Sequence, residues 1–141
     1  MKIKSLIVLL AICLSACTGS KYAGVPNQYQ ELISQTMQTA GSNAKELKKA
    51  LKQTPTTQRE AMAFLIAYMP ERDAKALTAN FLLENVDYAY KARAEFPWAK
   101  EVPNDIFLND VVAYVNLNEK RENWRKDFYE RFKKYVANCK T

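Results

Sequence analysis

The sequence contains no histidine, and it has only three cysteines and three glycines in 141 residues. Without histidine, no Cys-His or Ser-His catalytic pair can form, because the base of near-neutral pKa is missing. Zinc sites built from cysteine and histidine are excluded for the same reason. The glycines are too scattered to make a glycine-rich phosphate loop, at Gly19, Gly24 and Gly41. We therefore expect no catalytic residue, no metal site and no cofactor in this chain.

The first residues have the pattern of an export signal. Lys2 and Lys4 precede an apolar run over 6–14 that is too short to span a hydrocarbon core of ~30 Å as a helix. The tetrad Leu14-Ser15-Ala16-Cys17 follows, and it resembles the lipobox of bacterial lipoproteins. That resemblance implies a signal peptide at 1–16 and acyl chains such as palmitate on Cys17. An ordinary secretory cleavage near Ala16 is the alternative.

Lipidation at Cys17 would place the protein in the cell envelope. Several acyl chains hold a protein on a bilayer, whereas one chain binds reversibly. Residue 18 is threonine and not the aspartate typical of lipoproteins retained at the inner membrane, so we expect the outer membrane. Cys13 would leave with the signal peptide, and Cys139 would then have no disulfide partner.

The chain is basic, with a formal charge of +6 that falls to +4 once Lys2 and Lys4 are removed. The excess lies mainly in 45–52 and 121–140, where acidic residues are interleaved. We interpret these segments as solvated helix faces with affinity for anionic lipid headgroups. Nucleic acid is not an expected partner of an exported, membrane-anchored protein.

Beyond the signal, the pattern predicts a flexible tether at 17–27 and one helical domain at 28–141. Small and turn-forming residues fill the tether. Apolar residues then recur at helical spacing, interrupted by Gly41 and four prolines. The expected fold is all-α, an irregular bundle of about six helices. They are a helix from residue 27 to Gly41, a short one ending at Thr54, one over 59–69, one over 71–95, one from Pro103 to about Tyr114, and one over 122–138.

Several details of these helices can be predicted. Ser42 or Asn43 is a candidate cap of the second helix, and Thr57 with Glu60 has capping-box spacing before the third. The third helix is apolar nearly all round, which places it at the centre of the core. The fourth contains no proline or glycine, so we expect it unbroken. The β-branched run near residue 112 could also be read as a strand, but its start and short length favour a helix.

Aromatic residues are the strongest candidates for a binding surface. Trp98, Trp124 and Phe128, with Phe96 and Tyr114 nearby, could form a platform for a sugar or a peptide. The alternative is that they pin the interrupted segments together as core. The last helix is expected to turn one set of residues inward: Trp124, Phe128, Phe132, Tyr135 and Val136.

Carboxylates and the remaining thiol are weaker candidates. Two carboxylate pairs could be argued as acid and base in sugar chemistry, Glu84 with Asp87 and Asp105 with Asp110. Acids on an outer helix face more often serve solvation. Cys139 has Lys134 and Lys140 beside it but no base within reach, so we interpret it as structural or incidental.

The segment from Leu82 to Tyr129 resembles the helical N-terminal region of bacterial transglutaminase-like lipoproteins, a branch of the papain-like superfamily. The resemblance rests on spaced positions rather than on one motif. The matching positions are 89–93, 96–98, 103–108, Tyr114, Asn118, Glu119, Arg121, Trp124, Arg125, Phe128 and Tyr129.

In such proteins a catalytic cysteine, histidine and aspartate lie after this block, in an α/β domain that performs acyl transfer or amide hydrolysis on peptides. None of these residues has a counterpart here. The resemblance implies a membrane-anchored, non-catalytic segment that holds a catalytic domain away from the bilayer. It also implies an exposed apolar patch near 129–136, where that domain would pack, and that the chain is a fragment or a shortened product. The alternative is a self-sufficient helical lipoprotein that binds a protein or glycan partner.

Overall fold

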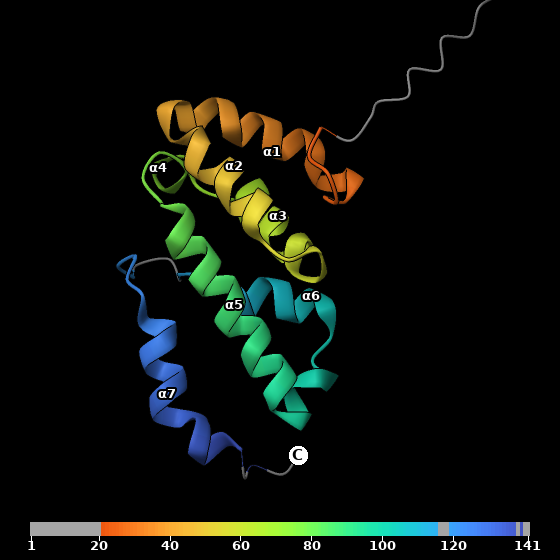
Figure 1. The fold of residues 1–141 in the computed structure, drawn as a ribbon, viewed down its shortest axis with the longest axis vertical. Helices are drawn as coiled ribbons and strands as arrows, with labels where there is room; N and C mark the ends of the chain where they lie inside the picture. The colour runs from red at the N-terminus through yellow and green to blue at the C-terminus, as the bar shows by residue number, and fades with distance from the viewer. Residues whose placement is uncertain (1–20, 116–118, 138, 140–141) are drawn as a thin grey trace, which may run out of the picture.

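A computed structural model describes residues 21–115, 119–137 and 139 (Figure 1). All regular structure in these residues is helical, which confirms the predicted all-α class. The predicted signal peptide and Cys17 lie outside the described residues. The α-helices are α1 (Asn27–Ala40), α2 (Ala44–Gln53), α3 (Arg59–Ala67), α4 (Glu71–Ala74), α5 (Ala79–Glu95), α6 (Asn104–Ile106) and α7 (Trp124–Val136). Short 3-10 turns are η1 (Gly41–Asn43), η2 (Thr56–Gln58) and η3 (Pro97–Glu101), and the π-helix η4 covers Phe107–Val111.

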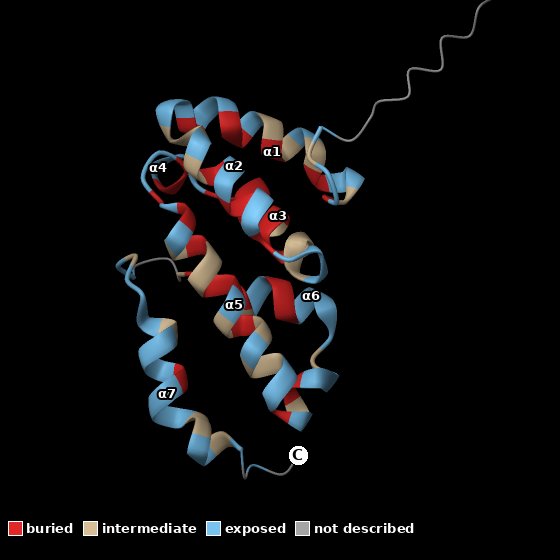
Figure 2. Ribbon diagram, in the orientation of Figure 1, coloured by how far each residue is buried: buried red, intermediate tan, exposed pale blue. Residues whose placement is uncertain are grey.

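Helix α3 is the centre of the main core, as predicted. Met62 and Ile66 are fully buried, and α1, α2 and α5 all pack against this helix. Figure 2 shows the contrast between α3, where buried residues dominate, and α7, where exposed residues dominate. A second, smaller core joins α7 to the end of α5 through Phe96, Ala99 and Tyr129. The molecule is therefore tightly packed around α3 and thinly packed at α7.

The prediction of one helix over 71–95 was wrong, because the chain breaks between α4 and α5. Asn43 Nδ2 donates to the carbonyl oxygens of Ala74 and Leu77, at 2.9 Å each. On the other side of the break, the Thr78 side chain accepts a hydrogen bond from the backbone N–H of Phe81, at 3.2 Å. A fixed carbonyl end on one side and a capped helix start on the other stabilise the break.

The predicted side-chain caps of the second and third helices do not form. Asn43 precedes α2, but its amide is engaged at the α4 break and makes no capping bond. Thr57 lies inside the turn η2, and no side chain caps α3. Both helices begin near the predicted residues, but neither start has a side-chain cap.

The fifth predicted helix ends earlier than expected. It starts at Asn104, widens into the π-helix η4 and stops at Val111, and no strand follows among the described residues. Asn85 Nδ2 donates to the carbonyl oxygen of Val112 at 2.7 Å, and the Arg125 guanidinium binds the carbonyl oxygens on either side. The side chains of Asn85 and Arg125 thus donate hydrogen bonds to carbonyl groups that would accept backbone N–H groups in a longer helix.

Candidate binding surfaces

Four aromatic side chains on α7 are exposed, which corrects the predicted inner face of this helix. Their exposed fractions are 38% for Trp124, 55% for Phe128, 43% for Phe132 and 62% for Tyr135. Each ring contacts the next, with centroids 5.9, 4.5 and 6.4 Å apart. Residues three and four apart share one helix face. We call this set the aromatic face.

An apolar groove of about 190 Å³ runs beside the aromatic face, between α7, the end of α5 and η3. Phe96 and Trp98 stack in it with their ring planes 4° apart and their centroids at 5.9 Å. The indole Nε1 of Trp98 is buried and has no hydrogen-bond partner among the described residues. The groove brings together Trp98, Trp124 and Phe128, the three residues predicted as a possible aromatic surface.

Helix α7 is held in place by one ring and two arginines. Tyr129 is 8% exposed and packs against Phe96 and Tyr88. Because Tyr129 faces inward, the stripe with four aromatic residues faces outward. Sequence periodicity alone could not decide between the two faces, since both carry aromatic rings.

Arg121 anchors the segment before α7 to α4. Its Nε and Nη2 each donate to one carboxylate oxygen of Asp73, both at 2.9 Å, and the Tyr114 hydroxyl donates to the same carboxylate at 3.0 Å. Asp73 is only 2% exposed. Burial, followed by the Asp73 carboxylate, raises the pKa of Tyr114 well above its usual value, and the hydrogen bond to Asp73 raises that of Arg121. This buried acid is fully engaged in a structural pair and is not available as a general base.

Arg125 lies beneath α7 and is the second anchor. Its guanidinium donates to Asn85 Oδ1 and to the carbonyl oxygens of Val111 and Ala113. Burial lowers the pKa of Arg125 to about 10. Arg121, Arg125 and Tyr129 were indicated only by the family resemblance, and Tyr114 also by the aromatic pattern; each of them ties α7 to the rest of the molecule.

The weaker catalytic candidates do not converge. Glu84 is half-buried and Asp87 is exposed, in a hollow that also contains Thr54 and Gln58. The other carboxylate pair, Asp105 and Asp110, is exposed. Cys139 is an exposed free thiol, and Lys140 lies outside the described residues. Within the described chain, no two of these groups share a pocket shielded from solvent.

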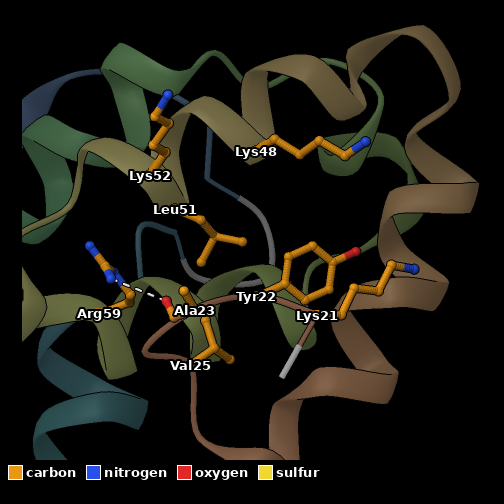
Figure 3. Close-up of a pocket in the computed structure, with 8 residues that line it drawn as sticks. All are labelled: Lys21, Tyr22, Ala23, Val25, Lys48, Leu51, Lys52 and Arg59. Carbon is orange, nitrogen blue, oxygen red and sulfur yellow. Dashed lines mark hydrogen bonds between the residues drawn. The ribbon is translucent and has the colours of Figure 1, made fainter. Parts of the chain in front are cut away.

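A second hollow of about 250 Å³ was not anticipated from the sequence. Figure 3 shows its lining, which comes from the N-terminal segment, from α2 and from the start of α3. Four cations surround it, and no acidic residue lines it: the full lining is Lys21, Tyr22, Ala23, Val25, Lys48, Leu51, Lys52 and Arg59. We call this cavity the basic hollow.

The basic hollow exists because residues 21–26, predicted as part of a tether, pack on the domain. Gln30 Nε2 donates to the carbonyl oxygens of Tyr22 and Val25 at 3.0 and 2.9 Å, and its Oε1 accepts from the Tyr22 N–H at 3.1 Å. Val25 is 5% exposed and belongs to the main core. The sequence signal of this docking is weak: Tyr22 and Val25 are apolar, and a glutamine follows five residues after Val25.

Arg59 completes the basic hollow and needs glycine beside it. Its Nη1 donates to the carbonyl oxygen of Ala23 at 3.1 Å and its Nη2 to that of Thr54 at 2.9 Å. Gly24 has φ +72°, and a Cβ there would lie 2.8 Å from Nη1. Arg59 Nε is buried and has no partner among the described residues. The turn at Gly24 thus lets a guanidinium close one side of the cavity.

No helix in the described part of the chain is both long enough and apolar enough to cross a bilayer. Comparison of the chain with protein-family models, with curated proteins and with solved structures found no match.

Proposed function

We propose that this chain is a lipid-anchored, non-catalytic helical segment that docks a partner domain through the aromatic face. The partner would be a transglutaminase-like domain that performs acyl transfer or amide hydrolysis on peptides. The observation that carries this proposal is the aromatic face itself, four contiguous exposed rings on a helix whose other side is pinned down. Contiguous exposed apolar surface on a soluble domain marks an interaction site.

The kind of occupant follows from the chemistry of the surface. Aromatic side chains dominate the energetically important centres of protein interfaces, where they fill pockets of the partner. The groove beside the aromatic face is almost entirely apolar, with Trp98 stacked on Phe96 in it, and so suits an apolar segment of a polypeptide. The block that resembles transglutaminase-like lipoproteins ends at Tyr129, within α7, and in those proteins the catalytic domain comes next.

The anchor is the second part of the proposal. Acyl chains on Cys17 would hold the chain on the outer membrane of the cell envelope. Cells fed labelled palmitate should incorporate the label into the protein, and Cys17→Ser should abolish it. Label that persists in the Cys17→Ser variant would refute the anchor at this residue.

Photo-crosslinking tests the docking. A benzophenone side chain is placed at Phe128 of the full chain in the cells that produce it, and a control carries it at the exposed Gln38 of α1. We expect position 128 to capture a polypeptide in which a cysteine is followed by a histidine and an aspartate, and position 38 not to capture it. Capture of polypeptides without such residues, or equal capture from both positions, would refute the proposal.

The alternative is a stand-alone lipoprotein that binds a glycan. The groove favours it in one respect, because two indole side chains line it, and aromatic rings suit the apolar face of a sugar ring. Both tryptophans line the groove, so their fluorescence reports on its occupancy. Quenching by cell-wall oligosaccharides that is lost in Trp98→Phe would favour the glycan over the domain.

A further inference from the structure

We propose that the basic hollow binds a phosphate group, supplied by the headgroup of an anionic phospholipid. This site is separate from the aromatic face. The inference rests on the proposed anchor at Cys17 and does not depend on a partner domain. It rests on the charge of the cavity, on its shape and on its place in the chain.

The charge of the basic hollow is not compensated. Lys21, Lys48, Lys52 and Arg59 surround it, and the lining contains no carboxylate. The ion pairs between described residues lie elsewhere, at 71–75, 73–121, 127–131 and 130–133. Uncompensated cations around a concave surface attract and concentrate anions. Phosphate oxygens are suited to such a set, because lysine and arginine bind them by charge-assisted hydrogen bonds.

The cavity is partly built in advance. The carbonyl oxygens of Ala23 and Thr54 hold the Arg59 side chain, so one cation is positioned before any ligand arrives. In Figure 3 the Tyr22 ring lies between Leu51 and the Lys21 side chain, and the Lys48 side chain runs above it. Lys48 and Lys52 are one turn apart on α2 and share a face. The lining thus combines cations with the apolar side chains of Tyr22, Val25 and Leu51. A phospholipid headgroup has matching parts, because its phosphate is joined to a glycerol backbone.

The position in the chain favours a lipid as the source. Lys21 is four residues after Cys17, so an acylated Cys17 would bring the basic hollow to the bilayer surface. In Figure 1 the N-terminal segment lies towards the end of the long axis opposite to the C-terminal half of α7. Anionic headgroups attract lysine and arginine side chains that lie near the membrane surface.

Hydrogen exchange on vesicles tests the inference. The full chain is reconstituted into vesicles of phosphatidylcholine alone and of phosphatidylcholine with phosphatidylglycerol. Amide exchange is then followed in residues 21–25, four of which line the cavity, and in 54–59, the segment that leads to Arg59. We expect phosphatidylglycerol to slow this exchange about tenfold, because a bound headgroup stabilises the docked arrangement of residues 21–26. Inorganic phosphate and glycerol 1-phosphate are added to the phosphatidylcholine vesicles as soluble probes.

A matched pair of variants supplies the control. K48Q/K52Q removes two charges from the lining, and K45Q/K49Q removes two exposed charges from the same helix outside it. We expect the first variant to lose the slowing and the second to keep it. Equal melting temperatures by circular dichroism would show that both variants fold.

The outcomes separate the sources. Slowing by phosphatidylglycerol but not by soluble phosphates supports the headgroup. Slowing by soluble phosphates alone would refute the lipid source. Equal loss in both variants, or no slowing at all, would refute the site. None of these results depends on residues of α7, so failure here and failure of the docking proposal are distinguishable.

Discussion

The absence of a side chain at Gly24 leaves room for the Arg59 guanidinium. Gly24→Ala should lower the free energy of unfolding by about 1 kcal/mol or more, because alanine disfavours positive φ and its Cβ would crowd the guanidinium. Gly41→Ala is the control, since Gly41 also has positive φ but no atom within 4 Å of a Cβ. Urea denaturation measures both. Equal losses would mean that the contact with Arg59 does not matter.

Tyr114 predicts how stability depends on alkaline pH. Its pKa is higher in the folded protein than the unfolded value of about 10. The stabilisation linked to this pKa shift is therefore complete below pH ~10. It is lost as the pH rises above that value, because the tyrosine of the unfolded chain releases its proton first. We expect Tyr114→Phe to reduce the fall in unfolding free energy between pH ~9.5 and ~11. Denaturation at several pH values would reveal it, and identical slopes would contradict it.

At the scale of elements, the break before α5 depends on a cap that the sequence pattern did not reveal. Thr78→Ala should cost about 1 kcal/mol of unfolding free energy, the usual value of an N-cap. Thr57→Ala should cost no more than ~0.5 kcal/mol, because that residue caps nothing. Thermal unfolding of the two variants compares them directly. A larger loss at Thr57 would restore the predicted capping box.

The break could not have been foreseen for a second reason. The groups that stabilise it come from residues more than thirty positions earlier, Asn43 on one side and Glu46 on the other. Local sequence describes helix propensity and caps, and the run 71–95 has nothing that interrupts a helix. Tertiary hydrogen bonds decided the outcome.

Helix α7 gives the sharpest contrast between two neighbouring rings. Tyr129→Ala should lower the unfolding free energy by about 3 kcal/mol, as expected for a large buried side chain. Phe128→Ala should change it by no more than ~0.5 kcal/mol, since Phe128 is 55% exposed. Chemical denaturation tests both. A similar cost for the two would place the aromatic face inside and undermine the docking proposal.

For the whole molecule, the helical class and the central α3 followed from apolar periodicity, from prolines and from Gly41. These signals are local and strong. The basic hollow was missed because three separate segments make it, one of which resembled a tether. The aromatic surface was found in part: Trp98, Trp124 and Phe128 were candidates for it. Trp124 and Phe128 were nevertheless also placed on the inner side of the last helix, together with Phe132 and Tyr135. Assigning the wrong face of α7 caused that error.

The distribution of acidic residues over the molecule predicts that the chain alone has no amidase or peptidase activity. The buried acid, Asp73, is paired; Glu84 and Asp87 share an open hollow, and Asp105 and Asp110 are exposed. We expect the full chain alone to release no ammonia from glutamine peptides and to cleave no peptide bond, because nothing described here combines a nucleophile with a base. An ammonia assay and mass spectrometry of the peptides measure this. Activity that Glu or Asp substitutions abolish would overturn the non-catalytic proposal.

The docking of residues 21–26 by Gln30 limits how much slack the proposed anchor has. Only the links from Cys17 to Lys21 remain, and at roughly 3.5 Å per residue they can reach about 14 Å when fully stretched. A protein anchored through so short a linker could not tumble freely. The end of the molecule that carries residues 21–26 would face the bilayer repeatedly. A partner bound to α7 would extend away from the membrane.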